Sequence, residues 1–121
     1  MEDSVRSSIV TDLAVMIDSH NGGDTTVLDI RNQSSWTDFF VITTATSGTH
    51  MKGLYRNILS FLRERNLKPL RSRKQISDDQ WLLVDCGDFV IHVMSEKSRQ
   101  FYELERLWYG GSVIDYSSKS S

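Results

Sequence analysis

The chain is poor in cysteine and proline and has no long apolar run. Cys86 is the single cysteine among 121 residues, so neither an internal disulfide nor a zinc site of several thiolates can form. No apolar stretch approaches the roughly 20 residues that span a bilayer. The opening MEDSVRSS carries acids and hydroxyls, whereas a secretory signal needs a basic end and then an apolar run. We therefore expect a soluble protein in the cytoplasm.

An excess of positive charge is also absent. The formal net charge of −2 gives no general attraction for nucleic acid, so contact with RNA needs a local basic patch. Between residues 63 and 74 one acid, Glu64, stands among the basic residues Arg63, Arg65, Lys68, Arg71, Arg73 and Lys74. No aromatic residues interleave there to stack on bases. The run is either a solvated face or an auxiliary RNA contact through Arg71, Arg73 and Lys74.

What the first half does contain is clear helix and strand periodicity. Apolar residues recur every three or four positions from residue 5, which predicts a helix that ends near His20. β-branched and aromatic residues predict strands at 25–30 and 39–46. A second amphipathic helix follows, capped by Ser47 or Thr49.

The second half predicts three more strands and a third helix. Pro69 has no N–H to donate, which favours a short edge strand in LKPLR, and residues 71–79 are predicted as a charged loop. Two strands lie within 81–95, and the third helix runs from Glu96 to about Trp108, with Phe101, Leu104 and Trp108 on one side. The order predicts an α/β fold with a mixed sheet of about five strands flanked by three helices. We expect one domain over residues 1–109 and a flexible tail over residues 110–121.

The hairpin within 81–95 is apolar on both faces. With Cys86-Gly87 as a two-residue turn, Asp85 pairs with Asp88 and Trp81 pairs with His92. One face then carries Trp81, Leu83, Val90, His92 and Met94, and the other carries Leu82, Val84, Phe89, Ile91 and Val93. The helices either bury both faces or leave one for another chain, with Trp81 and His92 at its margin.

The turn TTATSGTHMKG, residues 43–53, has the strand, glycine and helix order of a phosphate site. It lacks the glycine spacing of a dinucleotide fingerprint and the ending of a P-loop. After Ser47-Gly48 no acid occurs until Glu64, so the carboxylate pair that would hold divalent cations is missing. A structural helix start is favoured. The alternative is a nucleotide-binding or nucleotidyl-transferring enzyme that uses Ser47-Gly48.

The other candidates for chemistry are weaker. Asp85 and Asp88 flank the expected turn, where two solvated acids are the simpler interpretation, and their charges disfavour a thiolate at Cys86. The three histidines have no ligand-like spacing: His20, His50 and His92. We expect no catalytic residue, no cofactor and no metal.

Three segments resemble the bacterial ribosomal silencing factors, a family also named after Iojap: TDFFVITTATSGTH (37–50), KPLR (68–71) and WLLVDCGDFVIHVMSEKSRQFYELERLW (81–108). The last is the most specific, because it joins a Gly-Asp hairpin, a strand with an inner histidine and a helix of pattern R-x-x-Y-x-L-E-x-L-W. The resemblance implies a nucleotidyltransferase-like fold without catalytic acids. It also implies a binding protein in place of an enzyme.

Members of that family bind the fourteenth protein of the large ribosomal subunit, at the surface that meets the small subunit. The resemblance therefore implies that this chain blocks subunit joining sterically and slows translation when nutrients are scarce. It implies a partner-binding site of Trp81, Leu82, Asp85, Asp88, His92, Met94 and Tyr102. Trp81 is the expected central anchor, and the two acids complement a basic ribosomal protein. The apolar sheet face also raises the hypothesis of a homodimer in the free protein.

Overall fold

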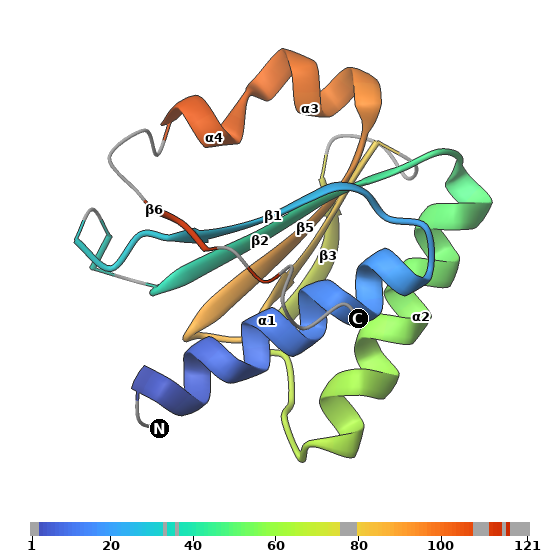
Figure 1. Ribbon diagram of the computed structural model, residues 1–121. Coiled ribbons are helices and arrows are strands. Elements are labelled where there is room, and N and C mark those ends of the chain that lie inside the picture. The colour runs from blue at the N-terminus through green and yellow to red at the C-terminus, as the bar shows by residue number, and fades with distance from the viewer. Residues whose placement is uncertain are drawn as a thin grey trace.

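The computed structural model describes residues 3–32, 34–35, 37–75, 80–107, 112–114 and 116. Over these residues, helices lie on both faces of one sheet (Figure 1). The elements in chain order are α1 (Asp3–Ser19), β1 (Gly23–Asp29), β2 (Phe39–Ala45), α2 (Gly48–Glu64), β3 (Arg71–Gln75), β4 (Trp81–Asp85), β5 (Phe89–Ser95), α3 (Glu96–Tyr102), α4 (Leu104–Leu107) and β6 (Ser112–Val113). No helix in this described part of the chain has the length and apolar content of a membrane span.

The sheet is mixed, as predicted, but the described residues form six strands in place of about five. Their order is β3-β4-β5-β2-β1-β6, with β2 and β5 parallel and every other pair antiparallel. The sixth strand, β6, pairs with Leu28 and Asp29 of β1 and lies within the stretch predicted as a flexible tail. Residues 110, 111, 115 and 117–121 of that stretch lie outside the described residues.

Each face of the sheet packs against its own helices. In Figure 1, α1 and α2 cover one face, and α3 and α4 cover the other. Side chains alternate along β5, so Phe89, Ile91 and Val93 enter the core beneath α1 and α2. Val90 and Met94 enter a second core with Leu104. Because helices pack on both faces of β5, neither face of this strand is polar in sequence.

The hairpin of β4 and β5 has a different register from the predicted one. Trp81 is opposite Met94, and Leu83 is opposite His92. The turn falls at Gly87 and Asp88 in place of Cys86 and Gly87, because the Cys86 N–H donates to the Phe89 carbonyl at 2.9 Å. Gly87 has the expected positive φ, 84°. The register differs by two residues, which is the side-chain period of a strand, so both predicted faces keep their residues.

The third predicted strand and the third predicted helix also need correction. The edge strand begins at Arg71, after Pro69, within the stretch predicted as a loop. The third helix is interrupted at Glu103, which adopts a left-handed conformation with φ 47° and separates α3 from α4. Phe101, before the break, is 77% exposed, whereas Leu104, after it, is buried, so the two do not share a packed side. Trp108, the predicted helix end, lies outside the described residues.

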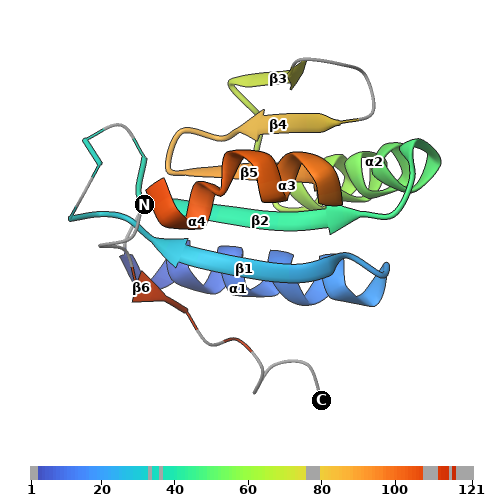
Figure 2. The same ribbon diagram turned by 90° about the horizontal axis from the view of Figure 1, so that it is seen from above.

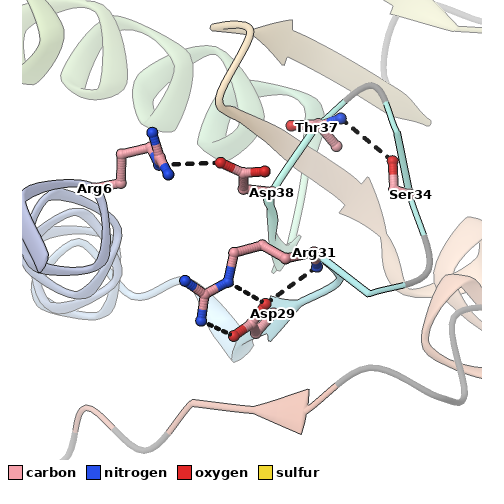
Figure 3. A network of polar contacts seen from close by, with 6 residues as sticks. All are labelled: Arg6, Asp29, Arg31, Ser34, Thr37 and Asp38. Carbon is pink, nitrogen blue, oxygen red and sulfur yellow. Dashed lines mark hydrogen bonds and ion pairs between the residues drawn. The ribbon is translucent and has the colours of Figure 1, made fainter. Parts of the chain in front are cut away.

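Polar contacts fix the start of β2 against α1 and the hairpin turn. Figure 3 shows Arg6 of α1 reaching Asp38, with 3.0 Å between Arg6 Nε and Asp38 Oδ2. The Asp38 N–H donates to the Asp88 carbonyl at 3.0 Å, and the Asp38 carbonyl accepts the Ile30 N–H. Beside it, hydrogen bonds from Arg31 hold the pKa of Asp29 below its usual value. These contacts anchor the turn end of β4 and β5.

Candidate partner-binding surface

The face of β4 on the α3 side is only partly covered. Seen from above in Figure 2, α3 and α4 lie over β2 and β5, and β4 and β3 extend beyond them. Trp81, Leu83 and Asp85 alternate onto this face, and each is partly exposed. The sequence left open whether helices bury both faces or leave one for another chain. Helices do lie on both faces, and among the described residues α3 covers this face of β4 only in part.

Aromatic rings from α3 continue the exposed apolar area of β4. The Trp81 and Tyr102 ring centroids are 4.9 Å apart, and the Tyr102 and Phe101 centroids are 4.8 Å apart at an interplanar angle of 75°. Phe101 is the outermost of these rings. We define the β4–α3 surface by four residues: Trp81, Leu83, Phe101 and Tyr102. A partly exposed group of large apolar side chains of this kind is typical of a protein-binding surface.

Two of the predicted site residues lie beneath this surface. His92 is only 4% exposed and Met94 is fully buried. The Trp81 Nε1–H donates to Nδ1 of His92 at 3.1 Å, and the ring of Phe40 meets the imidazole edge-on, with centroids 4.6 Å apart. Burial lowers the pKa of His92 to about 3, so the imidazole is neutral at physiological pH. Both residues support Trp81 from below.

Leu82 lies on the opposite face of the sheet. It is 3% exposed and belongs to the core beneath α1 and α2. Because successive side chains of a strand point to opposite faces, Leu82 and Trp81 cannot line the same surface. Among the residues predicted for the site, Trp81 and Tyr102 are the two that meet on the β4–α3 surface.

The two predicted acids lie at the other end of β4 from Trp81. Asp85 closes the strand, about 13 Å along the chain from Trp81 at the usual rise per residue, and its carboxylate accepts the Gly87 N–H at 2.9 Å. Asp88 lies in the turn. Between them, burial and then the charge of Asp85 raise the pKa of the Cys86 thiol to about 12. The turn is therefore a poor place for a thiolate nucleophile.

The turn at Ser47-Gly48 starts a helix. Of the two predicted caps, Ser47 and Thr49, Ser47 caps α2, because its Oγ accepts the His50 N–H at 3.0 Å. A cavity of about 320 Å³ adjoins it, and among the described residues that line it Glu96 is the one carboxylate. Over the described residues, no three His, Cys, Asp or Glu side chains gather as a metal site would require. This geometry does not supply the paired carboxylates of a metal-dependent nucleotidyl transfer.

The strand β3 contains Arg71, Arg73 and Lys74 and lies next to β4. In the antiparallel register, Arg73 is opposite Leu83 and Lys74 is opposite Leu82. A strand with three basic residues therefore borders the strand that carries Trp81. Residues 76–79 of the predicted charged loop lie outside the described residues.

Two residues of the surface were not predicted as site residues. Leu83 could have been found from the alternation that puts it on the same strand face as Trp81. Phe101 could not, because helical periodicity assigned it to the packed side of an unbroken helix. The left-handed Glu103 takes Leu104 out of the register of α3, and the residue type gives no signal of this conformation.

Comparisons with known proteins give one consistent family. A family model described as "Ribosomal silencing factor during starvation" matches residues 3–121. A ribosomal silencing factor of Haemophilus influenzae is 29% identical over 101 residues, which cover 84% of this chain and 98% of that protein. The mouse "Mitochondrial assembly of ribosomal large subunit protein 1" is 31% identical over 79% of this chain, which spans 43% of the mouse protein. A crystal structure of a Chromobacterium violaceum protein is similar in fold, with a TM-score of 0.77, 28% identity and coverage of 95% of this chain and 92% of that one.

Proposed function

This chain belongs to the family of ribosomal silencing factors, regulatory proteins that are not enzymes, and from that premise we propose how it silences. It binds the fourteenth protein of the large ribosomal subunit and sterically blocks joining of the small subunit. Translation is thereby repressed in the cytoplasm under nutrient limitation. The effect depends on how much of the large subunit is occupied, and hence on affinity and concentration.

The observation that carries this proposal is the β4–α3 surface. Trp81 and Tyr102 are of the residue types that dominate binding energy at protein interfaces, and they pack against each other at 4.9 Å. Phe101 extends the surface with 77% of its area exposed. Leu82, His92 and Met94 contribute indirectly, because each is buried and supports the strands that present Trp81.

Charge at the hairpin turn favours a basic partner. Asp85 and Asp88 both lie at the turn end of β4, and both are partly exposed. Acids at the margin of an interface change the association rate and orientation more than the final affinity. We expect their removal to slow association with a basic ribosomal protein and to leave the dissociation rate nearly unchanged.

The basic strand β3 adds a second proposal about ribosomal RNA. Because β3 borders β4, a partner at the β4–α3 surface lies beside the strand that carries Arg71, Arg73 and Lys74. Contact of these residues with ribosomal RNA phosphates would make binding weaker at higher salt. Replacing all three by Gln then reduces the salt dependence of binding to large subunits. An unchanged dependence removes the RNA contact from the proposal.

The same apolar surface suggests that a second copy of the chain covers it when no ribosome is bound. We propose such a homodimer because exposed aromatic residues on one face favour self-association. Sedimentation that detects monomer alone at high concentration contradicts it.

The fold is consistent with descent from a nucleotidyltransferase that has lost its catalytic acids and hence its activity. Support comes from the parallel pair β2 and β5, followed by helix starts at Gly48 and Glu96, and from the missing carboxylate pair. Calorimetric titration with nucleotide and magnesium tests this view, because measurable binding at the Ser47-Gly48 turn contradicts a scaffold that has lost its site.

The deciding experiment measures subunit joining with purified ribosomal subunits. We expect the protein at saturating concentration to bind large subunits and to prevent their joining to small subunits. Trp81→Ala should weaken binding about thirtyfold or more, the scale of an interface anchor, with a melting temperature close to that of the wild type.

Val113→Ala is the matched control. Val113 is an apolar residue that is 69% exposed on β6, at the opposite edge of the sheet from β3 and β4. It should bind and block like the wild type. Normal subunit joining while the protein is bound at saturation rules out the steric mechanism.

A further inference from the structure

His92 is a buried polar residue whose place in the core is unfavourable. It is 4% exposed, and its Nε2 has no hydrogen-bond partner. The tryptophan indole N–H can act only as a donor, so Nδ1 of His92 must accept it and the imidazole proton must lie on Nε2. That leaves a buried N–H donor without an acceptor, which lowers the stability of the folded state. A leucine or phenylalanine would fill this position without that penalty.

The geometry shows what the histidine provides in return. Trp81 is opposite Met94 and His92 is opposite Leu83, so His92 is the diagonal neighbour of Trp81 on the same sheet face. The indole therefore has two contacts that restrict its rotation: the hydrogen bond to Nδ1 at 3.1 Å and the Tyr102 ring at 4.9 Å. Phe40 packs edge-on against the imidazole of His92 and so restricts the rotation of the imidazole. The contacts therefore run from Phe40 of β2 through His92 to the partly exposed indole of Trp81.

We propose that His92 is a positioning residue, which accepts the Trp81 Nε1–H at Nδ1 and holds the indole in the orientation that the ribosomal partner binds. This inference rests on the proposed function, because it assumes that Trp81 anchors the partner. Trp81 is partly exposed, so its N–H would be satisfied by water if His92 were absent, and the folded state does not need this acceptor. The hydrogen bond instead restricts the rotation of the indole in the free protein. The entropy cost of ordering this side chain is then not paid on binding, which raises the affinity.

The test compares substitutions at residue 92 that differ in one property. His92→Asn keeps an acceptor close to the position of Nδ1, and His92→Leu has nearly the same shape without an acceptor. Proton–nitrogen NMR of the free protein reports the Trp81 indole N–H, which Trp81→Phe identifies. We expect a downfield, slowly exchanging signal in the wild type and in His92→Asn. In His92→Leu the signal should move upfield and exchange faster.

Binding to purified bacterial large ribosomal subunits gives the functional readout. We expect His92→Leu to bind about three- to tenfold more weakly than the wild type, the range for ordering one side chain, although its melting temperature is equal or higher. His92→Asn should recover most of the affinity. In the Trp81→Phe background, which has no indole N–H, His92→Leu should have no further effect on binding.

The outcomes separate this inference from the proposed function. Equal affinities of the wild type and His92→Leu, or an undiminished effect of His92→Leu in the Trp81→Phe background, overturn the positioning role and leave silencing untouched. Failure of the wild-type protein to bind large subunits overturns the proposed function, and the NMR comparison then decides whether His92 orients Trp81. If His92→Leu does not fold, His92→Phe serves as the variant without an acceptor.

Discussion

At the scale of single residues, position in the strand alternation separates roles that residue type alone does not. Trp81 and Leu82 are adjacent and both apolar, yet Trp81 reaches the β4–α3 surface and Leu82 is 3% exposed in the opposite core. His92 and Met94 share the face of Trp81 but are buried beneath it. Sequence reasoning placed all of them at a partner site. In the structure Trp81 is partly exposed, whereas Leu82, His92 and Met94 are buried.

Cys86 is predicted to react slowly although it is partly exposed. Burial and the Asp85 carboxylate raise its pKa to about 12, and the thiolate is the reactive form. Near pH 8, alkylation by iodoacetamide should be at least about a hundredfold slower in the folded protein than in the urea-unfolded chain. Mass spectrometry over time measures both rates.

Asp85→Asn tests the electrostatic part of this prediction. The amide oxygen can still accept the Gly87 N–H, but the negative charge is gone. The pKa of Cys86 should fall, and alkylation of the folded variant should be faster than in the wild type. Equal alkylation rates in folded and unfolded wild-type protein contradict the raised pKa.

At the scale of secondary-structure elements, the hairpin and the last helix show two kinds of error. The hairpin register was wrong by two residues, and the division of its residues between two faces was still correct, because a strand repeats its side-chain direction every two residues. The predicted helix was wrong by one interruption at Glu103. Phe101 before the break is exposed and Leu104 after it is buried, although the prediction put both on one side. A helix distributes its residues around an axis, so a break changes which of them face the core.

The β4–β5 turn provides a stability prediction at this scale. Gly87→Ala should destabilise the protein by about 1–2 kcal/mol, because alanine disfavours a positive φ. The glycine has φ 84°, and a Cβ there would lie 3.3 Å from Leu70 Cδ1. The free energy of unfolding from urea titration measures the change.

Gly53→Ala is the matched control and should have the opposite sign. Gly53 lies within α2, and a Cβ added there meets nothing within 4 Å. Alanine favours a helix over glycine by about 0.5–1 kcal/mol. A loss of stability from Gly53→Ala, or no loss from Gly87→Ala, contradicts the roles assigned to the helical backbone at Gly53 and the positive φ at Gly87.

At the scale of the whole molecule, the buried imidazole links stability to pH. The pKa of His92 falls from 6.5 to about 3 on folding, so between these values the unfolded chain holds a proton that the folded chain does not. The contribution of His92 to the free energy of unfolding is therefore fully present above pH 6.5 and is lost as the pH falls toward 3. From about pH 7 to about pH 5 the loss should be about 2 kcal/mol.

His92→Leu isolates this contribution. Urea unfolding of both proteins across the same pH range should show a shallower decrease for the variant, because it has no imidazole to protonate in the unfolded state. Parallel curves for the two proteins contradict a buried, neutral His92.

The sequence alone was sufficient for the features that depend on local chemistry and strand period. These include the absence of an internal disulfide, a capped start of α2 at Ser47 or Thr49, the mixed sheet and the division of the hairpin into two apolar faces. Only the tertiary structure decided which face stays open, because that depends on where α3 ends and on which strands it covers. It also decided that His92 lies beneath Trp81 and that Phe101 lies outside. Burial is a property of the assembled layers, and alternation along one strand does not determine it.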